Sequence, residues 1–254
     1  MSRINKKGVF FDFYVDETSE NADLYMMGDI TSYKWSEEDV DFNTFKDALD
    51  SIKDNGVLNI YQNCGGGECF LASAIISLLD RCKKKRNITT NCYVDSLTAS
   101  ASGWITCACD NIYINTNSIF MLHKPLSCVW GNADDMEKEI EVLNKIQNEV
   151  MIPTYLRKAK EGITEDTIKE LINKETWLFG HEIEYYFDVT FVENDNKKVA
   201  SVNMDYLKKY NNIPQKAKDI LEKQAEQKKS LELEKENKKL EKLNKEIDLA
   251  LALI

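Results

Sequence analysis

The sequence is poor in the residues that build metal centres and has no long apolar run. Only two of its 254 residues are histidine, and its seven cysteines include no CxxC pair, so the ligand spacing of a structural zinc site is missing. The longest apolar stretch, residues 69–79, contains two serines and is too short to cross a bilayer. We therefore expect no metal, no cofactor and no membrane-spanning segment.

Basic residues are fewer than acidic ones. Lysine and arginine number 33 against 43 acidic residues, which gives a formal net charge of −10. Nucleic acids and anionic membranes are bound by clustered basic residues, so we expect neither as a main partner. No apolar run follows the basic start of the chain, so no signal peptide is predicted, and an odd number of cysteines is then typical of reduced thiols in the cytoplasm.

The composition changes sharply after Pro214. Residues 215–254 contain no glycine, proline, cysteine, histidine or aromatic residue, and they carry 10 lysines and 9 acidic residues. Apolar residues recur there every seven positions, at Leu233, Leu240, Ile247 and Ile254. This spacing predicts a helical tail, either a self-associating coiled coil or a single charged helix that frays.

Strand and helix patterns alternate before the tail. Strands are predicted at residues 23–28, 57–61, 88–94, 112–114 and 119–122. Helices are predicted at residues 41–53, 68–83, 98–109, 164–173 and 134–160, the last kinked at Pro153. Such alternation is typical of parallel strand pairing in an α/β domain. We divide the chain into an N-terminal segment (1–20), this domain (21–200) and a linker with the tail (201–254).

Three consecutive glycines at residues 65–67 lie between a predicted strand and a predicted helix. Glycine lets backbone N–H groups turn toward a ligand, and the helix start adds the positive end of a dipole, so an anion or an oxyanion could be held there. Neither GxxxxGK[ST] nor GxGxxG is present, which disfavours a nucleotide-binding loop. A plain tight turn explains the same glycines equally well.

Two further features carry candidate catalytic side chains. A strand runs into a helix of very small residues around Ser100, where a hydroxyl at the first turn lies near free amides and suits a nucleophile. Ser100 and Ser102 could instead be helix caps or packing residues, and the absence of a GxSxG motif argues against an α/β-hydrolase. His123 ends a predicted strand and suits a general base, unless its role is structural, and His181 is the competing base.

Four segments occur in the order and at the gaps typical of one family. They are NCGGG at 63–67, LTASA at 97–101, MLHKP at 121–125 and ETWL at 175–178. Over roughly residues 20–195 the chain therefore resembles the ClpP family of serine peptidases. The segment VWGNADD at 129–135 is similar to the ClpP-related proteases of phages and prophages that are associated with head maturation.

The resemblance implies an architecture. The expected fold is the α/β spiral of ββα units that ClpP shares with the crotonases, with helix 134–160 as the handle through which rings of protomers stack. An apolar stripe on this helix fits burial against another helix: Met136, Ile140, Leu143, Ile146, Val150 and Met151. Self-association into rings is expected, and burial of the stripe within its own protomer is the alternative.

The resemblance also implies a catalytic site. Ser100 would be the nucleophile and His123 the base, and Glu175 stands where the family usually has the aspartate of the triad. The backbone amides of Gly67 and Ala101 would form the oxyanion hole.

The same resemblance implies that the substrate is a peptide or protein. Gly66, Pro125, Leu126 and Ser127 are expected to contact it. The segment 126–130 would offer a strand edge along which an extended peptide could bind.

Besides Glu175, the chain departs from the family pattern at three further places. Gly65 replaces a proline that stiffens the loop, and Ser96 replaces a glycine four positions before the nucleophile. The extra freedom at Gly65 raises the entropy cost of ordering the oxyanion hole. Residues 1–20 do not resemble the segment that forms the axial loops of ClpP, which argues against docking of a Clp ATPase and against ATP-dependent degradation.

These features predict a cytoplasmic serine endopeptidase of the ClpP type that acts in capsid maturation or in general peptide degradation. Two alternatives remain open. A catalytically weak or inactive homologue could serve as an assembly scaffold, with its tail organising capsid proteins. A crotonase-like acyl-CoA enzyme would share the fold, although nothing in the sequence marks a CoA site.

Overall fold

The computed structural model describes residues 14–15, 21–35, 39–193, 210, 212–223, 226, 229–230, 233, 237 and 240. Its centre is a mixed sheet of eight strands. The strands are β1 (Tyr14–Val15), β2 (Asn21–Met26), β3 (Val57–Cys64), β4 (Thr89–Ala99), β5 (Asn111–Ile114), β6 (Ile119–Leu122), β7 (Thr176–Phe179) and β8 (Thr190–Phe191). The helices are α1 (Phe42–Ser51), α2 (Cys69–Arg86), α3 (Ala101–Ala108), α4 (Ala133–Lys145), α5 (Ile152–Leu156) and α6 (Glu165–Asn173), with a π-helical segment at Ile146–Met151 and a 3₁₀ segment at Gly180–Tyr185. Residues 215–223 are also helical.

The central strands β2 to β5 pair in parallel, as the sequence predicts. Strands β1 and β7 pair antiparallel with β2 and β6. Strand β4 is long enough to pair with two neighbours, since residues 91–93 pair with β5 and residues 97–99 pair with β6. The sheet therefore divides along β4, which ends directly before Ser100.

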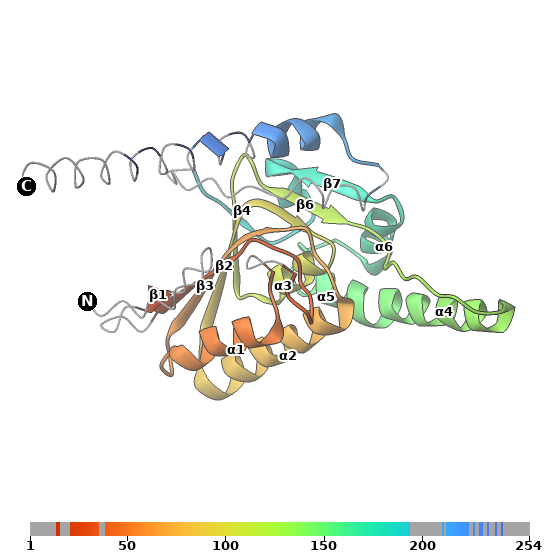
Figure 1. Ribbon diagram of the computed structural model, residues 1–254, viewed down its shortest axis with the longest axis horizontal. Helices are drawn as coiled ribbons and strands as arrows, with labels where there is room; N and C mark the ends of the chain where they lie inside the picture. Colours follow the sequence, from red (N-terminus) through yellow and green to blue (C-terminus); the bar gives the residue numbers. More distant parts are fainter. Residues whose placement is uncertain are drawn as a thin grey trace, which may run out of the picture.

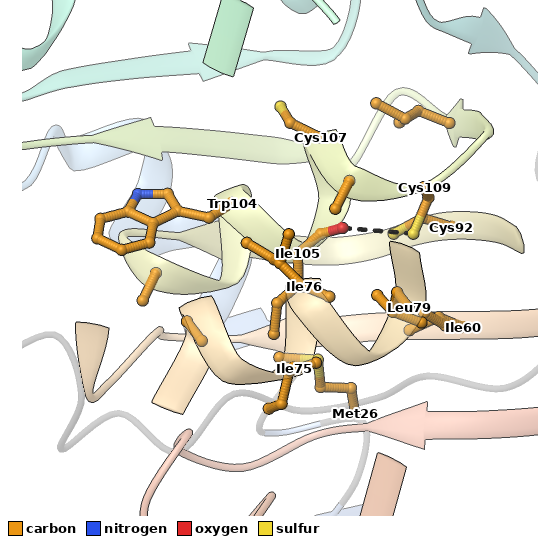
Figure 2. Close-up of a cluster of buried hydrophobic side chains, with 14 of the residues drawn as sticks. Met26, Ile60, Ile75, Ile76, Leu79, Cys92, Trp104, Ile105, Cys107 and Cys109 are labelled. Carbon is orange, nitrogen blue, oxygen red and sulfur yellow. Dashed lines mark hydrogen bonds between the residues drawn. The ribbon is translucent and has the colours of Figure 1, made fainter. Parts of the chain in front are cut away.

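One face of β2, β3 and β4 is covered by α1, α2 and α3 (Figure 1). Figure 2 shows Ile75 and Leu79 of α2 in one cluster with Met26 of β2, Ile60 of β3 and Ile105 of α3. All five side chains are buried. Because burial of apolar surface is the dominant favourable term in folding, this cluster holds the strands that lead to the glycine segment and to Ser100 in place.

The opposite face of the same strands carries a row of half-buried tyrosines. Tyr25, Tyr61, Tyr93 and Tyr113 occupy paired positions on β2 to β5, and neighbouring rings stack with centroids 4.6, 4.8 or 5.1 Å apart. The in-register pairing of the strands produces this row, because each tyrosine pairs directly with the next.

A second buried cluster lies on β6 and β7, beneath the C-terminal helix at residues 215–223 (Figure 1). Ala217 and Leu221 of this helix are fully buried. They pack in one cluster with apolar residues of β4, β6 and β7: Leu97, Ala99, Ile119, Met121, Trp177 and Phe179. The first part of the predicted tail is therefore docked on the domain.

The predicted helix at 98–109 begins too early. Thr98 and Ala99 continue β4, because they pair with Phe120 and Met121 of β6, and α3 starts only at Ala101. The strand predicted at 88–94 is correspondingly longer. Propensity favoured a helix for these small residues, but pairing with a second strand overrides it.

The predicted long helix at 134–160 is divided. Helix α4 passes into the π-helical segment before Pro153, and α5 ends at Leu156. Beyond it the chain leaves the helix because Ala159 forms a β-bridge with Phe187. Helix α4 contains no buried residue and extends away from the body of the domain (Figure 1).

The ends of the chain are described only in part. Leu233 and Leu240 are helical and more than half exposed, whereas Ile247 and Ile254 of the same heptad pattern lie outside the described residues. Of the N-terminal segment only β1 is described, paired with β2. Among the described residues no helix combines the length and the hydropathy needed to cross a membrane.

Candidate active site

Ser100 lies at the turn between β4 and α3. Its backbone adopts φ 56° and ψ −129°, which is rare for a residue other than glycine and costs about 1–3 kcal/mol. The Ser100 amide donates to the Met121 carbonyl (3.0 Å), and the Ser100 carbonyl accepts from the Gly103 amide (3.0 Å) and from the Tyr155 hydroxyl (3.2 Å). These contacts hold the strained turn, and with it the Ser100 side chain.

His123 follows the last residue of β6. Because β6 pairs with the end of β4, the carboxyl end of β6 lies beside Ser100. Nε2 of His123 lies 2.7 Å from Oγ of Ser100, and His123 is only 7% exposed. In the tautomer that carries its proton on Nδ1, the Ser100 hydroxyl donates to Nε2, as a general base requires.

Burial lowers the pKa of His123 below its ordinary value of 6.5, and the nearby charge of Glu175 opposes this effect only in part. The imidazole must be neutral to accept a proton, so a lower pKa keeps it competent at lower pH. We expect kcat/KM for peptide hydrolysis to fall as the pH decreases, with the midpoint of this acid limb below 6.5. A pH profile of kcat/KM measures it, and His181→Ala should leave the midpoint unchanged; a midpoint above 6.5 would contradict the assignment.

The glycine segment 65–67 passes close to the Ser100 turn. Gly66 has φ +92°, and a Cβ placed there would lie 2.6 Å from the Ala99 carbonyl oxygen, 2.7 Å from Ser100 Cβ and 3.1 Å from the Ala101 nitrogen. A Cβ on Gly67 (φ +151°) would collide with the backbone of Ile30. Both the backbone conformation and the close approach therefore require glycine.

The amides of Gly67 and Ala101 donate to no acceptor within the described part of the chain. Ala101 is the first residue of α3, so its N–H points out of the start of the helix without an intrahelical partner. Free backbone donors near a serine hydroxyl can stabilise an oxyanion.

Glu175 precedes β7 and lies close to His123. Strands β6 and β7 pair with Leu122 opposite Thr176, which brings the two adjoining residues together. The Glu175 carboxylate accepts a hydrogen bond from the Asn212 amide (3.0 Å), and among the described residues it makes none to the imidazole. Its influence on His123 is therefore a charge effect that raises the pKa of the imidazole.

The sequence model of a known family, Clp protease, matches residues 44–187, which is more than half of the 254-residue chain. The chain belongs to the Clp protease family. A search of the curated proteins found no match. The matched residues contain Ser100, His123, Glu175 and the glycine segment, whereas Ile30 and Asn212, which contact the glycine segment and Glu175, lie outside the match.

The residues predicted to contact substrate divide into two groups. Gly66 and Pro125 are buried beside the site, whereas Leu126 and Ser127 are exposed. Residues 123–130 contain no regular secondary structure and pair with no described strand. In this Clp protease domain the segment after His123 thus leaves its backbone groups available to a partner.

His181, the competing base, lies outside this site. Its ring stacks on Phe191 with centroids 3.9 Å apart, and its Nδ1 contacts the Glu184 carboxylate. Ser102 is likewise structural, because its buried hydroxyl lies within hydrogen-bonding distance of the Cys64 (2.9 Å) and Ala99 (2.7 Å) carbonyls. Among the described residues no cluster of histidine, cysteine or carboxylate side chains is arranged to hold a metal ion.

Three residues of the site lie outside the motifs. Tyr155 supports the Ser100 turn from α5, and the segment at Tyr210 and Asn212 contacts the glycine segment and Glu175. Tyr155 lies within a predicted helix and Tyr210 beyond the family match, so no spacing in the sequence relates either of them to Ser100.

Proposed function

We propose that the chain is a serine endopeptidase of the ClpP type that cleaves peptide bonds through an acyl-enzyme. The observation that supports this most strongly is the 2.7 Å contact between Ser100 Oγ and His123 Nε2. Both side chains belong to a Clp protease domain, and both adjoin two amides without a described acceptor.

In the first half of the proposed reaction, His123 Nε2 takes the Ser100 proton while Oγ forms a bond to the peptide carbonyl carbon. The amides of Gly67 and Ala101 donate to the oxyanion that develops on the carbonyl oxygen. One such donor typically stabilises the transition state by about 2.7–4 kcal/mol. His123 then gives its proton to the amine as the C–N bond breaks, which leaves Ser100 acylated.

In the second half, water attacks the acyl carbon while His123 Nε2 accepts one of its protons. Collapse of the new oxyanion breaks the bond to Ser100 Oγ, which recovers its proton from His123. Glu175 would stabilise the imidazolium in both halves through its charge, as its effect on the pKa of His123 suggests.

The exposed segment 126–130 is the proposed substrate-binding edge. Its unpaired backbone supports binding of an extended peptide by strand addition, a mode that recognises main chain rather than a single side chain. We therefore propose that unfolded polypeptides are the substrate class.

A catalytically weak homologue that acts as a scaffold is the second candidate. One observation favours it: the Glu175 carboxylate bonds to Asn212 instead of orienting the imidazole. No observation favours acyl-CoA chemistry, for which a serine–histidine pair is not needed.

Casein cleavage distinguishes the two candidates. Incubation of the full chain with casein should release acid-soluble peptides, and prior treatment with a fluorophosphonate should stop the release. A scaffold predicts intact casein at every concentration of the chain tested.

The apolar stripe of α4 supports self-association. On α4, Met136 and Ile140 are 48% and 58% exposed, and this helix has no buried residue. At the other end of the stripe Ile146 and Met151 pack in the protomer's own core, so the part of the stripe that is left uncovered is the part on α4. Exposed apolar patches of this kind mark interfaces. We propose that α4 packs on the α4 of another protomer when rings stack.

Ile140→Glu is expected to shift the chain to smaller species in sedimentation velocity, because a carboxylate would be buried without a partner in the stacked interface. Lys138→Gln is the matched control, since it also lowers the net charge by one unit, at an exposed position of the same helix outside the stripe. If both variants sediment like the parent, α4 is not the interface.

We further propose a cytoplasmic role in phage or prophage head maturation. The segment at 129–135 and the charged helical tail support it, and capsid proteins would then be both substrate and partner. No Clp ATPase is included in this proposal, because residues 1–20 lack the resemblance that axial docking would need.

A further inference from the structure

A tyrosine from beyond the family match packs against His123. The match ends at residue 187, yet Tyr210 lies between His123 and Trp177 and is only 8% exposed. Its ring meets His123 edge-on, with centroids 5.3 Å apart, and meets Trp177 edge-on at 5.6 Å. Perpendicular ring contacts of this kind restrict the rotation of an imidazole.

The same tyrosine binds the glycine segment. Its hydroxyl donates to the Gly65 carbonyl at 2.5 Å, and this contact is buried. Ile30 bridges Gly66 and Gly67, since its amide donates to the Gly66 carbonyl (2.9 Å), but this bridge does not include Gly65. In the proposed reaction the Gly67 amide must stay aimed at the developing oxyanion. The Tyr210 hydroxyl is thus the side-chain contact that restrains the first residue of the segment.

The segment that carries Tyr210 is anchored at several points. The Asn212 amide donates to Glu175 (3.0 Å), the Lys216 ammonium lies 4.4 Å from the centre of the Phe179 ring, and Ala217 is buried. The first contact is made to the residue before β7 and the second to the last residue of β7. Ala217 packs in the cluster on β6 and β7. Tyr210 is therefore held in position by the docked C-terminal helix.

We propose that Tyr210 is a positioning residue, which fixes the glycine segment through Gly65 and the imidazole of His123 through ring contact. The inference rests on the proposed peptidase function, because it assigns Tyr210 a task in that site. The Clp protease domain would then depend on a residue outside the matched segment to position its oxyanion donors.

Tyr210→Phe tests the hydroxyl while it keeps the ring. Loss of one hydrogen bond to a buried carbonyl should lower kcat for a fluorogenic peptide about tenfold, with KM nearly unchanged. The rate of labelling by a fluorophosphonate should fall in parallel, since the phosphonyl oxygen occupies the oxyanion hole. Tyr93→Phe is the matched control, because it removes a hydroxyl from the tyrosine row on the sheet and should leave both rates unchanged.

A second variant separates positioning from general destabilisation. Gly65 is not among the glycines with a positive φ, so its backbone does not exclude proline, and Gly65→Pro in the Tyr210→Phe background should restore part of the lost kcat by restricting the segment directly. If Tyr210 had only a structural role, Tyr210→Phe would lower Tm, and Gly65→Pro would not restore kcat. Both variants are assayed below their measured Tm.

The outcomes are distinct. An unchanged or raised kcat and labelling rate in Tyr210→Phe would overturn the inference, and a raised rate would identify the segment as a barrier over the site. If Ser100→Ala abolishes hydrolysis while Tyr210→Phe does not affect it, only the role of Tyr210 is lost. If Ser100→Ala retains hydrolysis, the proposed peptidase function itself fails.

Discussion

Ser100→Ala is expected to lower kcat for peptide hydrolysis by about a thousandfold or more, to the level that binding and the oxyanion donors provide alone. The variant removes the oxygen that forms the acyl-enzyme. Within the described part of the chain, no other serine or threonine hydroxyl forms a hydrogen bond with His123. The fold should survive, because the Ser100 turn is held by its backbone contacts to Met121, Gly103 and Tyr155.

Hydrolysis of a fluorogenic peptide by parent and variant measures the effect. Ser77→Ala is the control, since its hydroxyl is exposed on α2 and donates to the Ser73 carbonyl, far from the His123 imidazole in sequence and in no described contact with it. Parent-like kcat in Ser100→Ala, with Tm unchanged, would show that hydrolysis proceeds without the nucleophile we assign.

Gly66→Ala should have the second largest effect. A Cβ at this position would lie 2.6 Å from the Ala99 carbonyl oxygen and 2.7 Å from Ser100 Cβ, which is closer than real contacts allow. Either the nucleophile or the oxyanion segment must move to make room. A displacement of about 1 Å in a catalytic group typically costs about a hundredfold in rate, so we expect at least that loss in kcat.

Gly162→Ala provides a matched control for backbone strain. Gly162 has φ +91°, almost the same as Gly66, but a Cβ there would meet nothing within 4 Å. The strain alone should cost about 1–3 kcal/mol of stability at either position. Thermal unfolding and kcat should therefore separate the two variants, because Gly162→Ala should lower only Tm and Gly66→Ala should lower both Tm and kcat. Equal kcat values in the two variants would mean that the glycine segment does not border the site.

Local patterns predicted the central elements well because each has a clear period or boundary. The alternating residues of β2 and β3 and the apolar spacing of α1 and α2 are set within the segment itself. The predicted boundary between β4 and α3 was wrong because its position depends on pairing with β6, a strand some twenty residues further on. The division of the 134–160 helix depends likewise on the distant bridge to Phe187.

The site could be predicted only as far as its motifs reach. Ser100 and His123 stand in segments whose order resembles the ClpP family, and the fold brings them to 2.7 Å. Glu175 follows the same resemblance, yet its carboxylate bonds to Asn212, a contact that no motif encodes. Tyr210 belongs to no pattern, because its place beside His123 is determined by packing of the C-terminal helix on β6 and β7.

Mapping of a covalent adduct tests the central claim most directly. The full chain is treated with a fluorophosphonate, digested, and analysed by tandem mass spectrometry. We predict one phosphonyl group per chain, carried by Ser100 and absent after His123→Ala. An adduct on another residue, or undiminished hydrolysis in a chain that takes up no reagent, would contradict the assignment of Ser100 and His123 as the catalytic pair.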